Sequence, residues 1–92
     1  MPAEESREVR LRRLYMRSIR RGIREMDLIL GAFAERELAR LGHDDLESYE
    51  RLLNENDQDL YRWVSGAEPA PEALNGIIAL VRKGEVGTGR LV

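Results

Sequence analysis

Apolar residues recur at every third or fourth position through most of this 92-residue chain, and that spacing is the period of an amphipathic helix. No stretch alternates apolar and polar residues as a half-buried strand does. The helical stripes are separated by glycine, proline and asparagine in connections of two to six residues. The pattern therefore predicts an all-α fold, a compact five-helix bundle in a single domain, because short connections make successive helices pack as neighbours.

The predicted helices have recognisable ends. The first is capped by Ser6 and interrupted at Gly22, where glycine can take positive φ. The second is expected at about 23–41. The third should run from an Asp44 cap, with Glu47 as its capping-box partner, to about 54, and the fourth from an Asn56 or Asp57 cap to 66. The fifth is expected from 71 to 84. The domain is thus expected at 6–84, with flexible ends at 1–5 and 85–92.

The amino-acid composition excludes several classes of protein. The chain has no cysteine, so disulfide frameworks and thiolate zinc sites are excluded, and no run of about 18 apolar residues predicts a membrane span. Residues 1–25 carry eight arginines against four glutamates. Organelle transit peptides avoid acidic residues, whereas Glu4, Glu5 and Glu8 open this chain. We expect a soluble cytoplasmic protein.

The sequence contains few residues that could carry out catalysis. The one histidine, His43, precedes an expected helix cap, where an ordinary surface position is the simplest interpretation. His43, Asp44 and Asp45 lack the spacing that aims three ligands at one metal ion. We therefore expect no catalytic site, no metal site and no stably bound cofactor, and conclude that the chain is not an enzyme.

A ridge of arginines is the better candidate for function. Arg10, Arg13, Arg17, Arg20 and Arg21 share the polar face of the first predicted helix. The ridge could be a solvated surface, in which each pair such as Arg21 with Glu25 contributes only about 0.2 to 0.5 kcal/mol. Nucleic acid is a less suitable ligand, because the sequence pI is about 5.5 and few aromatic residues accompany the arginines. An acidic protein surface fits better.

Glu25 has two interpretations that are compatible. With Gly22 as the N-cap of the second helix, its charge would interact with the helix dipole for about 0.3 to 1 kcal/mol. Leu28 and Ala32 follow on the same side of that helix, away from the main apolar stripe. A charged motif bordered by apolar surface is typical of a docking patch.

The order of segments resembles that of the succinate dehydrogenase assembly factor 2 family, called SdhE in bacteria. The likeness begins at Arg21-Gly22-x-x-Glu25 and Asp27, passes through Asp44-Asp45-Leu46, and ends in Asn56-Asp57-Gln58-Asp59-Leu60-Tyr61-Arg62-Trp63. One departure is Gln58, where family members commonly place proline, which affects a helix start.

The resemblance implies a five-helix factor that binds the flavoprotein subunit of succinate dehydrogenase, and in some bacteria of fumarate reductase. It would promote covalent attachment of FAD to a histidine of that partner, while holding no FAD stably itself. The matching residues Arg21, Gly22 and Glu25 would form the partner-binding motif, flanked by Arg17, Arg24 and Asp27. We expect a monomer that uses no membrane and is an unlikely binder of nucleic acid.

Two other functions stay open on the sequence. A small adapter could place the arginine ridge on nucleic acid phosphates, in which case binding would weaken steeply with salt. A regulatory module of the toxin–antitoxin kind could use the same surface on a different protein.

Overall fold

The computed structural model describes residues 5–89, with side chains described up to residue 83. Its helices are α1 (Arg7–Ser18), α2 (Arg24–Glu37), the short 3₁₀ helix η1 (Leu38–Arg40), α3 (His43–Leu53), α4 (Asp57–Ser65) and α5 (Glu72–Gly89). The described residues contain no strand, so the predicted all-α five-helix fold is confirmed. None of these helices is long and apolar enough to cross a bilayer.

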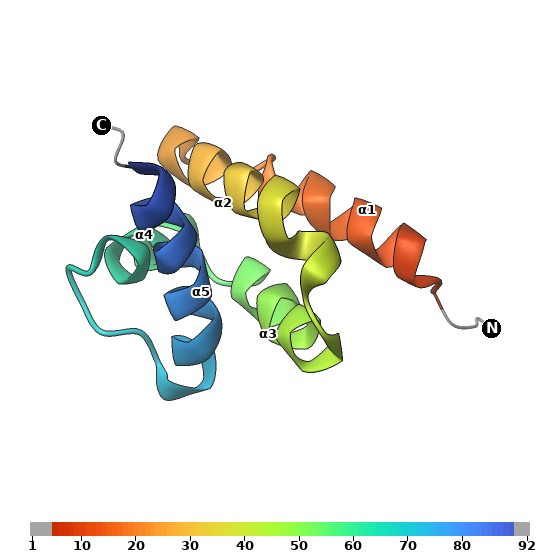
Figure 1. Ribbon diagram of the computed structural model, residues 1–92. Coiled ribbons are helices and arrows are strands. Elements are labelled where there is room, and N and C mark those ends of the chain that lie inside the picture. The colour runs from red at the N-terminus through yellow and green to blue at the C-terminus, as the bar shows by residue number, and fades with distance from the viewer. Residues whose placement is uncertain (1–4, 90–92) are drawn as a thin grey trace.

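Helices α1 and α2 form an antiparallel hairpin that lies over α3, α4 and α5 (Figure 1). The Tyr15 hydroxyl donates to a Glu35 carboxylate oxygen at 3.1 Å. Nearer the start of α1, Arg7 donates to the carbonyl of Leu41 at 2.8 Å. The junction between the two helices, residues 19–23, therefore lies at the end of the hairpin away from Arg7.

The core forms where the apolar stripes of all five helices meet. Its buried apolar members are Leu14, Met26, Leu30, Phe33, Ala34, Leu38, Leu41, Leu46, Tyr49, Leu52, Leu53, Leu60, Val64, Leu74, Ile77, Ile78 and Val81. At its centre the rings of Phe33 and Tyr49 lie 5.3 Å apart. Burying a large apolar side chain contributes roughly 1.5 to 3 kcal/mol, so the predicted stripes supply the driving force for packing the helices together.

Several helix ends match the local sequence. Ser6 caps α1 by accepting from the Val9 N–H at 3.1 Å. Asn56, of the two candidates, caps α4 by accepting from the Asp59 N–H at 2.9 Å. Gly66 ends α4 with φ at +87°, the left-handed conformation that glycine adopts most easily. Side-chain caps and a left-handed glycine act over a few residues, which is why these ends are predictable.

Other ends differ from the prediction. Helix α3 begins at His43 after a Gly42 N-cap without a side-chain cap bond, so the predicted Asp44 cap and its capping box with Glu47 are wrong. Asp44 instead lies in the first turn, where its charge still favours the helix dipole. Helix α2 starts at Arg24 after Ile23, and Gly66 is the one glycine with positive φ among the described residues. The predicted N-cap and positive φ at Gly22 are therefore also wrong.

The C-terminal helix is longer than predicted. It continues beyond Gly84 through Gly89, because a glycine inside a helix costs about 1 kcal/mol relative to alanine without ending it. At the other end, Glu5, which the prediction places in a flexible segment, pairs with Arg13 at 2.8 Å. Residues 1–4 and 90–92 of the predicted flexible ends lie outside the described residues.

A buried hydrogen bond joins α1 to α3 beneath the hairpin. The Ser18 and Tyr49 hydroxyls lie 2.6 Å apart, and Ser18 also donates to the Leu14 carbonyl at 2.8 Å. Burial raises the pKa of Tyr49 to about 12, although the Ser18 hydrogen bond and the nearby Arg21 charge act in the opposite direction. The folded protein thus favours the neutral phenol.

We expect Tyr49→Phe to lower the free energy of unfolding by about 1 kcal/mol at pH 8, the usual contribution of one hydrogen bond. Because the tyrosine pKa is raised on folding, its stabilisation is complete below about pH 10, the unfolded value, and is lost as the pH rises towards about 12. Urea unfolding between pH 8 and 11.5 measures this loss. Tyr49→Phe should show a smaller alkaline decline than wild type and Tyr15→Phe; an equal decline in all three would contradict the assignment.

Candidate functional site at the junction of α1 and α2

The α1–α2 junction is fastened to the α3–α4 junction by Arg21. Its Nη1 donates to the Leu53 carbonyl and its Nη2 to the Glu55 carbonyl, both at 2.8 Å. Its Nε pairs with Asp57 Oδ1 at 2.7 Å. The planar guanidinium fork can bind three acceptors at once, and it lies where the carbonyls at the end of α3 need donors. Arg21 therefore ties together segments more than thirty residues apart.

Asp57 completes this clamp from the first turn of α4. Its Oδ2 accepts hydrogen bonds from the backbone N–H groups of Gly22 and Ile23. A Cβ atom added to Gly22 would lie 3.3 Å from that same oxygen, which is tighter than an ordinary contact. The absence of a side chain at Gly22 thus allows the backbone to approach the carboxylate, and this approach, rather than a positive φ, accounts for the glycine.

Two of the flanking residues also make contacts within the chain. Asp27, in the first turn of α2, accepts from the backbone N–H of Arg21. Arg17 donates to the Asn54 side-chain oxygen at 2.8 Å. The side chains of Arg21 and Asp57 are only 10% and 11% exposed. The geometry therefore gives Arg21 and Asp27 a part in shaping the junction.

The outward surface of the junction consists of Gly22, Arg24 and Glu25, which are all exposed. Within the described residues, no hydrogen bond or ion pair engages the side chains of Arg24 and Glu25. Leu28, one turn beyond Glu25, is 61% exposed, and Ala32 is exposed one turn further. We call Gly22, Arg24, Glu25, Leu28 and Ala32 the motif face. It is the apolar-bordered charged surface that the sequence predicts.

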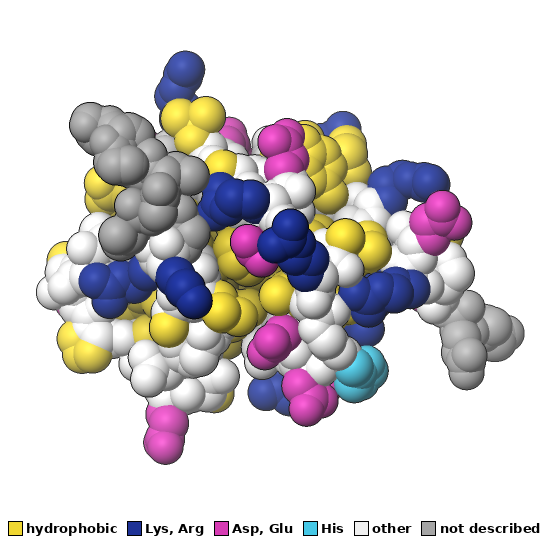
Figure 2. Space-filling model, viewed as in Figure 1, with side chains coloured by type: hydrophobic (Ala, Val, Ile, Leu, Met, Phe, Trp, Pro, Cys, Tyr) yellow, Lys and Arg dark blue, Asp and Glu magenta, His cyan; other side chains and the backbone are white. Residues whose placement is uncertain are grey.

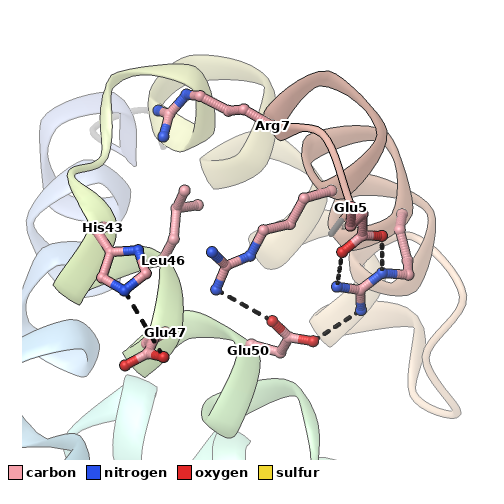
Figure 3. A pocket seen from close by; sticks show the side chains of 8 residues that line it. Glu5, Arg7, His43, Leu46, Glu47 and Glu50 are labelled. Atoms are coloured by element: carbon pink, nitrogen blue, oxygen red, sulfur yellow. Dashed lines mark hydrogen bonds and ion pairs between the residues drawn. The ribbon is translucent and has the colours of Figure 1, made fainter. Parts of the chain in front are cut away.

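The predicted arginine ridge is mostly occupied by acceptors within the chain. Arg13 pairs with both Glu5 and Glu50 at 2.8 Å, and Arg10 pairs with Glu50 at 3.3 Å. Figure 3 shows these pairs around a polar cavity of about 510 Å³ between α1 and α3. The Arg13 hydrogen bond lowers the pKa of Glu50 below its ordinary value, which keeps the carboxylate charged. The ridge therefore joins α1 to α3.

A metal site and a continuous basic binding surface are poorly supported. No group of three histidine, cysteine, aspartate or glutamate side chains in the described part of the chain could hold a metal ion. On the face seen in Figure 2, basic and acidic side chains are interspersed and form no continuous basic stripe. The arrangement can present a rigid charged and apolar surface to another molecule.

The part that Asp57 plays in shaping the junction is one that the sequence does not reveal. The sequence offers it only as a possible helix cap, and no local pattern joins it to Arg21, which lies 36 positions earlier. The two remaining acceptors of Arg21 are backbone carbonyls, which no residue type identifies. The signal that the sequence did offer was an arginine beside an expected interhelical turn, where the carbonyls at a helix end need donors.

Most of the chain is similar to known proteins. Residues 12–84 match the family described as flavinator of succinate dehydrogenase, Sdh5. The chain is 45% identical to the mitochondrial succinate dehydrogenase assembly factor 2 of Aspergillus terreus over 69 residues, which are 75% of this chain and 22% of that protein. It is 36% identical to the protein of the same name in Danio rerio over 76 residues, or 80% of this chain and 48% of that one. The match thus spans less than half the length of either relative.

Proposed function

Because the chain belongs to the family of succinate dehydrogenase flavinators, a family of assembly factors, we propose that it binds the flavoprotein subunit of succinate dehydrogenase and promotes covalent attachment of FAD. Fumarate reductase, where present, is a second client. The observation that carries this proposal is the motif face, in which Gly22 and Glu25 are exposed on a junction held rigid by Arg21 and Asp57.

The chain's contribution is binding and positioning. A junction whose backbone is already fixed loses little conformational freedom when a partner docks, which favours affinity. By binding the conformation of the flavoprotein that holds FAD beside its acceptor histidine, the chain raises the population of the reactive arrangement. FAD and the reacting groups belong to the partner, and the chain itself retains no cofactor in this proposal.

The nucleic-acid alternative has less support. Arg10 and Arg13 pair with carboxylates, and Arg21 is only 10% exposed. Phosphate binding would have to displace these partners. Regulation of an unrelated protein would use the same motif face, and the family membership favours the flavoprotein over such a partner.

We propose that the chain is found in the same cell compartment as the flavoprotein subunit. The expectation of a cytoplasmic protein rests on the acidic residues among the N-terminal arginines, whereas the curated relatives are named mitochondrial. Fractionation of the source cell, with the flavoprotein subunit as a marker, tests whether the two proteins share a compartment. We expect them in the same fraction.

Affinity capture from the source cell tests the proposed function. The tagged chain should retain a flavoprotein band that carries covalent flavin fluorescence, and cells lacking the chain should contain that protein with much less covalent flavin. Capture at raised salt serves as a control, since phosphate contacts weaken steeply with salt. Recovery of RNA or DNA in place of a flavoprotein, or normal covalent flavin without the chain, would contradict the proposal.

A further inference from the structure

A groove runs beside the motif face, between the start of α2 and the exposed side of α4. It has a volume of about 510 Å³ and is lined by Ile23, Glu25, Gln58, Tyr61 and Arg62. Tyr61 is 43% exposed. Together with Leu28 at 61%, it supplies two of the three large apolar side chains that are exposed in the described chain. Both flank Glu25, so exposed apolar area is concentrated here.

The charges of the groove are unbalanced. Arg62 is paired with Asp59 and lies 3.5 Å from Glu68, so its charge is satisfied from its own side of the groove. Glu25 is the lining carboxylate, and no cation of the described residues pairs with it. A groove that combines the apolar surface of Ile23 and Tyr61 with a carboxylate lacking a partner among the described residues is complementary in charge and polarity to a cation carried on apolar surface.

We propose that this groove receives a segment of the flavoprotein subunit that presents a lysine or arginine flanked by apolar side chains. The cation pairs with Glu25, while the flanking apolar groups pack on Leu28 and Tyr61. Gln58 also lines the groove, and in this proposal its side-chain amide hydrogen-bonds the backbone of the segment. This inference rests on the proposed function, and it extends the contact surface from the motif face onto α4.

The test uses the full chain, the purified flavoprotein subunit and calorimetry. Leu28→Ala and Tyr61→Ala should each raise the Kd at least tenfold, the loss expected when an anchor residue at the centre of an interface is truncated. Val9→Ala is the matched control, since Val9 is 48% exposed but lies in α1, about 15 Å along the helix from the junction. It should change the Kd by less than twofold. All the variants should melt within a few degrees of wild type.

Substitution of Glu25 tests whether the segment bound in the groove carries a cation. Glu25→Gln should weaken binding and also reduce its salt dependence, because the ion pair with the partner's cation is lost while the shape is kept. If Glu25→Gln weakens binding but Leu28→Ala and Tyr61→Ala behave like Val9→Ala, the groove proposal fails and the proposed function stands. If the wild-type chain does not bind the flavoprotein, the proposed function itself fails. Self-association through the groove, detected by ultracentrifugation and abolished by Tyr61→Ala, would also overturn the inference.

Discussion

Arg21→Ala should lower the free energy of unfolding by about 3 kcal/mol, the loss expected when one partner of a largely buried ion pair is removed. The change leaves the Leu53 and Glu55 carbonyls without their donor and leaves Asp57 without its cation. For a domain of this size the melting temperature should fall by roughly 15 °C. Urea and thermal unfolding followed by circular dichroism measure both quantities.

Arg21→Lys is the informative control. Lysine keeps the charge but cannot reproduce the fork that binds three acceptors, so it should recover less than half of the loss. The double variant Arg21→Ala/Asp57→Ala should be clearly less destabilised than the sum of the two single variants, since each removes the same clamp. Unchanged melting in Arg21→Ala, or strict additivity, would show that the clamp does not stabilise the fold.

Because Arg21 stabilises the junction, its substitution alone does not test partner binding by the Arg-Gly-x-x-Glu motif. Loss of flavinylation by Arg21→Ala has two possible causes, a lost partner contact or a loosened junction. Only a residue that is exposed and unpaired separates them. Of the two charged residues that define the motif, Arg21 and Glu25, it is Glu25 that is exposed and has no hydrogen-bond or ion-pair partner within the described part of the chain.

Glu25→Arg is expected to reduce covalent flavin in the client at least tenfold while leaving the chain folded. Reversing the charge sets a cation against the cation proposed in the partner, and like charges across an interface cost several kcal/mol. Its effect on folding should be about 1 kcal/mol, since the side chain is exposed in the first turn of α2 and interacts mainly with the helix dipole. In-gel flavin fluorescence from cells lacking the native factor reads the first effect, and thermal melting reads the second.

Glu8→Arg provides the matched control for this experiment. Glu8 is also an exposed glutamate in the first turn of a helix, but it lies in α1, at the far end of the hairpin. The two variants should lose similar stability, and only Glu25→Arg should lose flavinylation. Equal flavinylation in the two variants would remove Glu25 from the proposed contact.

The fold was largely predictable because its information is local. The spacing of Leu11, Leu14 and Tyr15 defines the buried side of α1, and the caps at Ser6 and Asn56 act within three residues. Helix ends that lack such a signal were misplaced. Gly84 fits a helix end in the sequence, yet the helix continues to Gly89, since one glycine costs too little to decide where a helix stops.

Long-range packing decides which acceptors pair with the arginines of the predicted ridge. Helical periodicity places Arg10, Arg13 and Arg21 on the polar side of α1, but it does not say which element covers that side. Packing α1 against α3 brings Glu50 to Arg10 and Arg13, and the α3–α4 junction brings Asp57 to Arg21. A surface predicted to bind an acidic partner is therefore largely satisfied within the chain.

The sequence by itself determined the five-helix fold and located the motif around Gly22, because periodicity, capping and motif order are properties of neighbouring residues. Only the tertiary structure decided which charged residue of that motif is buried and paired and which is exposed. Arg21 turns inward because three acceptors from residues 53–57 converge on its guanidinium, and Glu25 remains outside because no cation of the described chain reaches it. Burial and pairing, which depend on contacts distant in sequence, separate the residue that builds the junction from the residue that stays exposed.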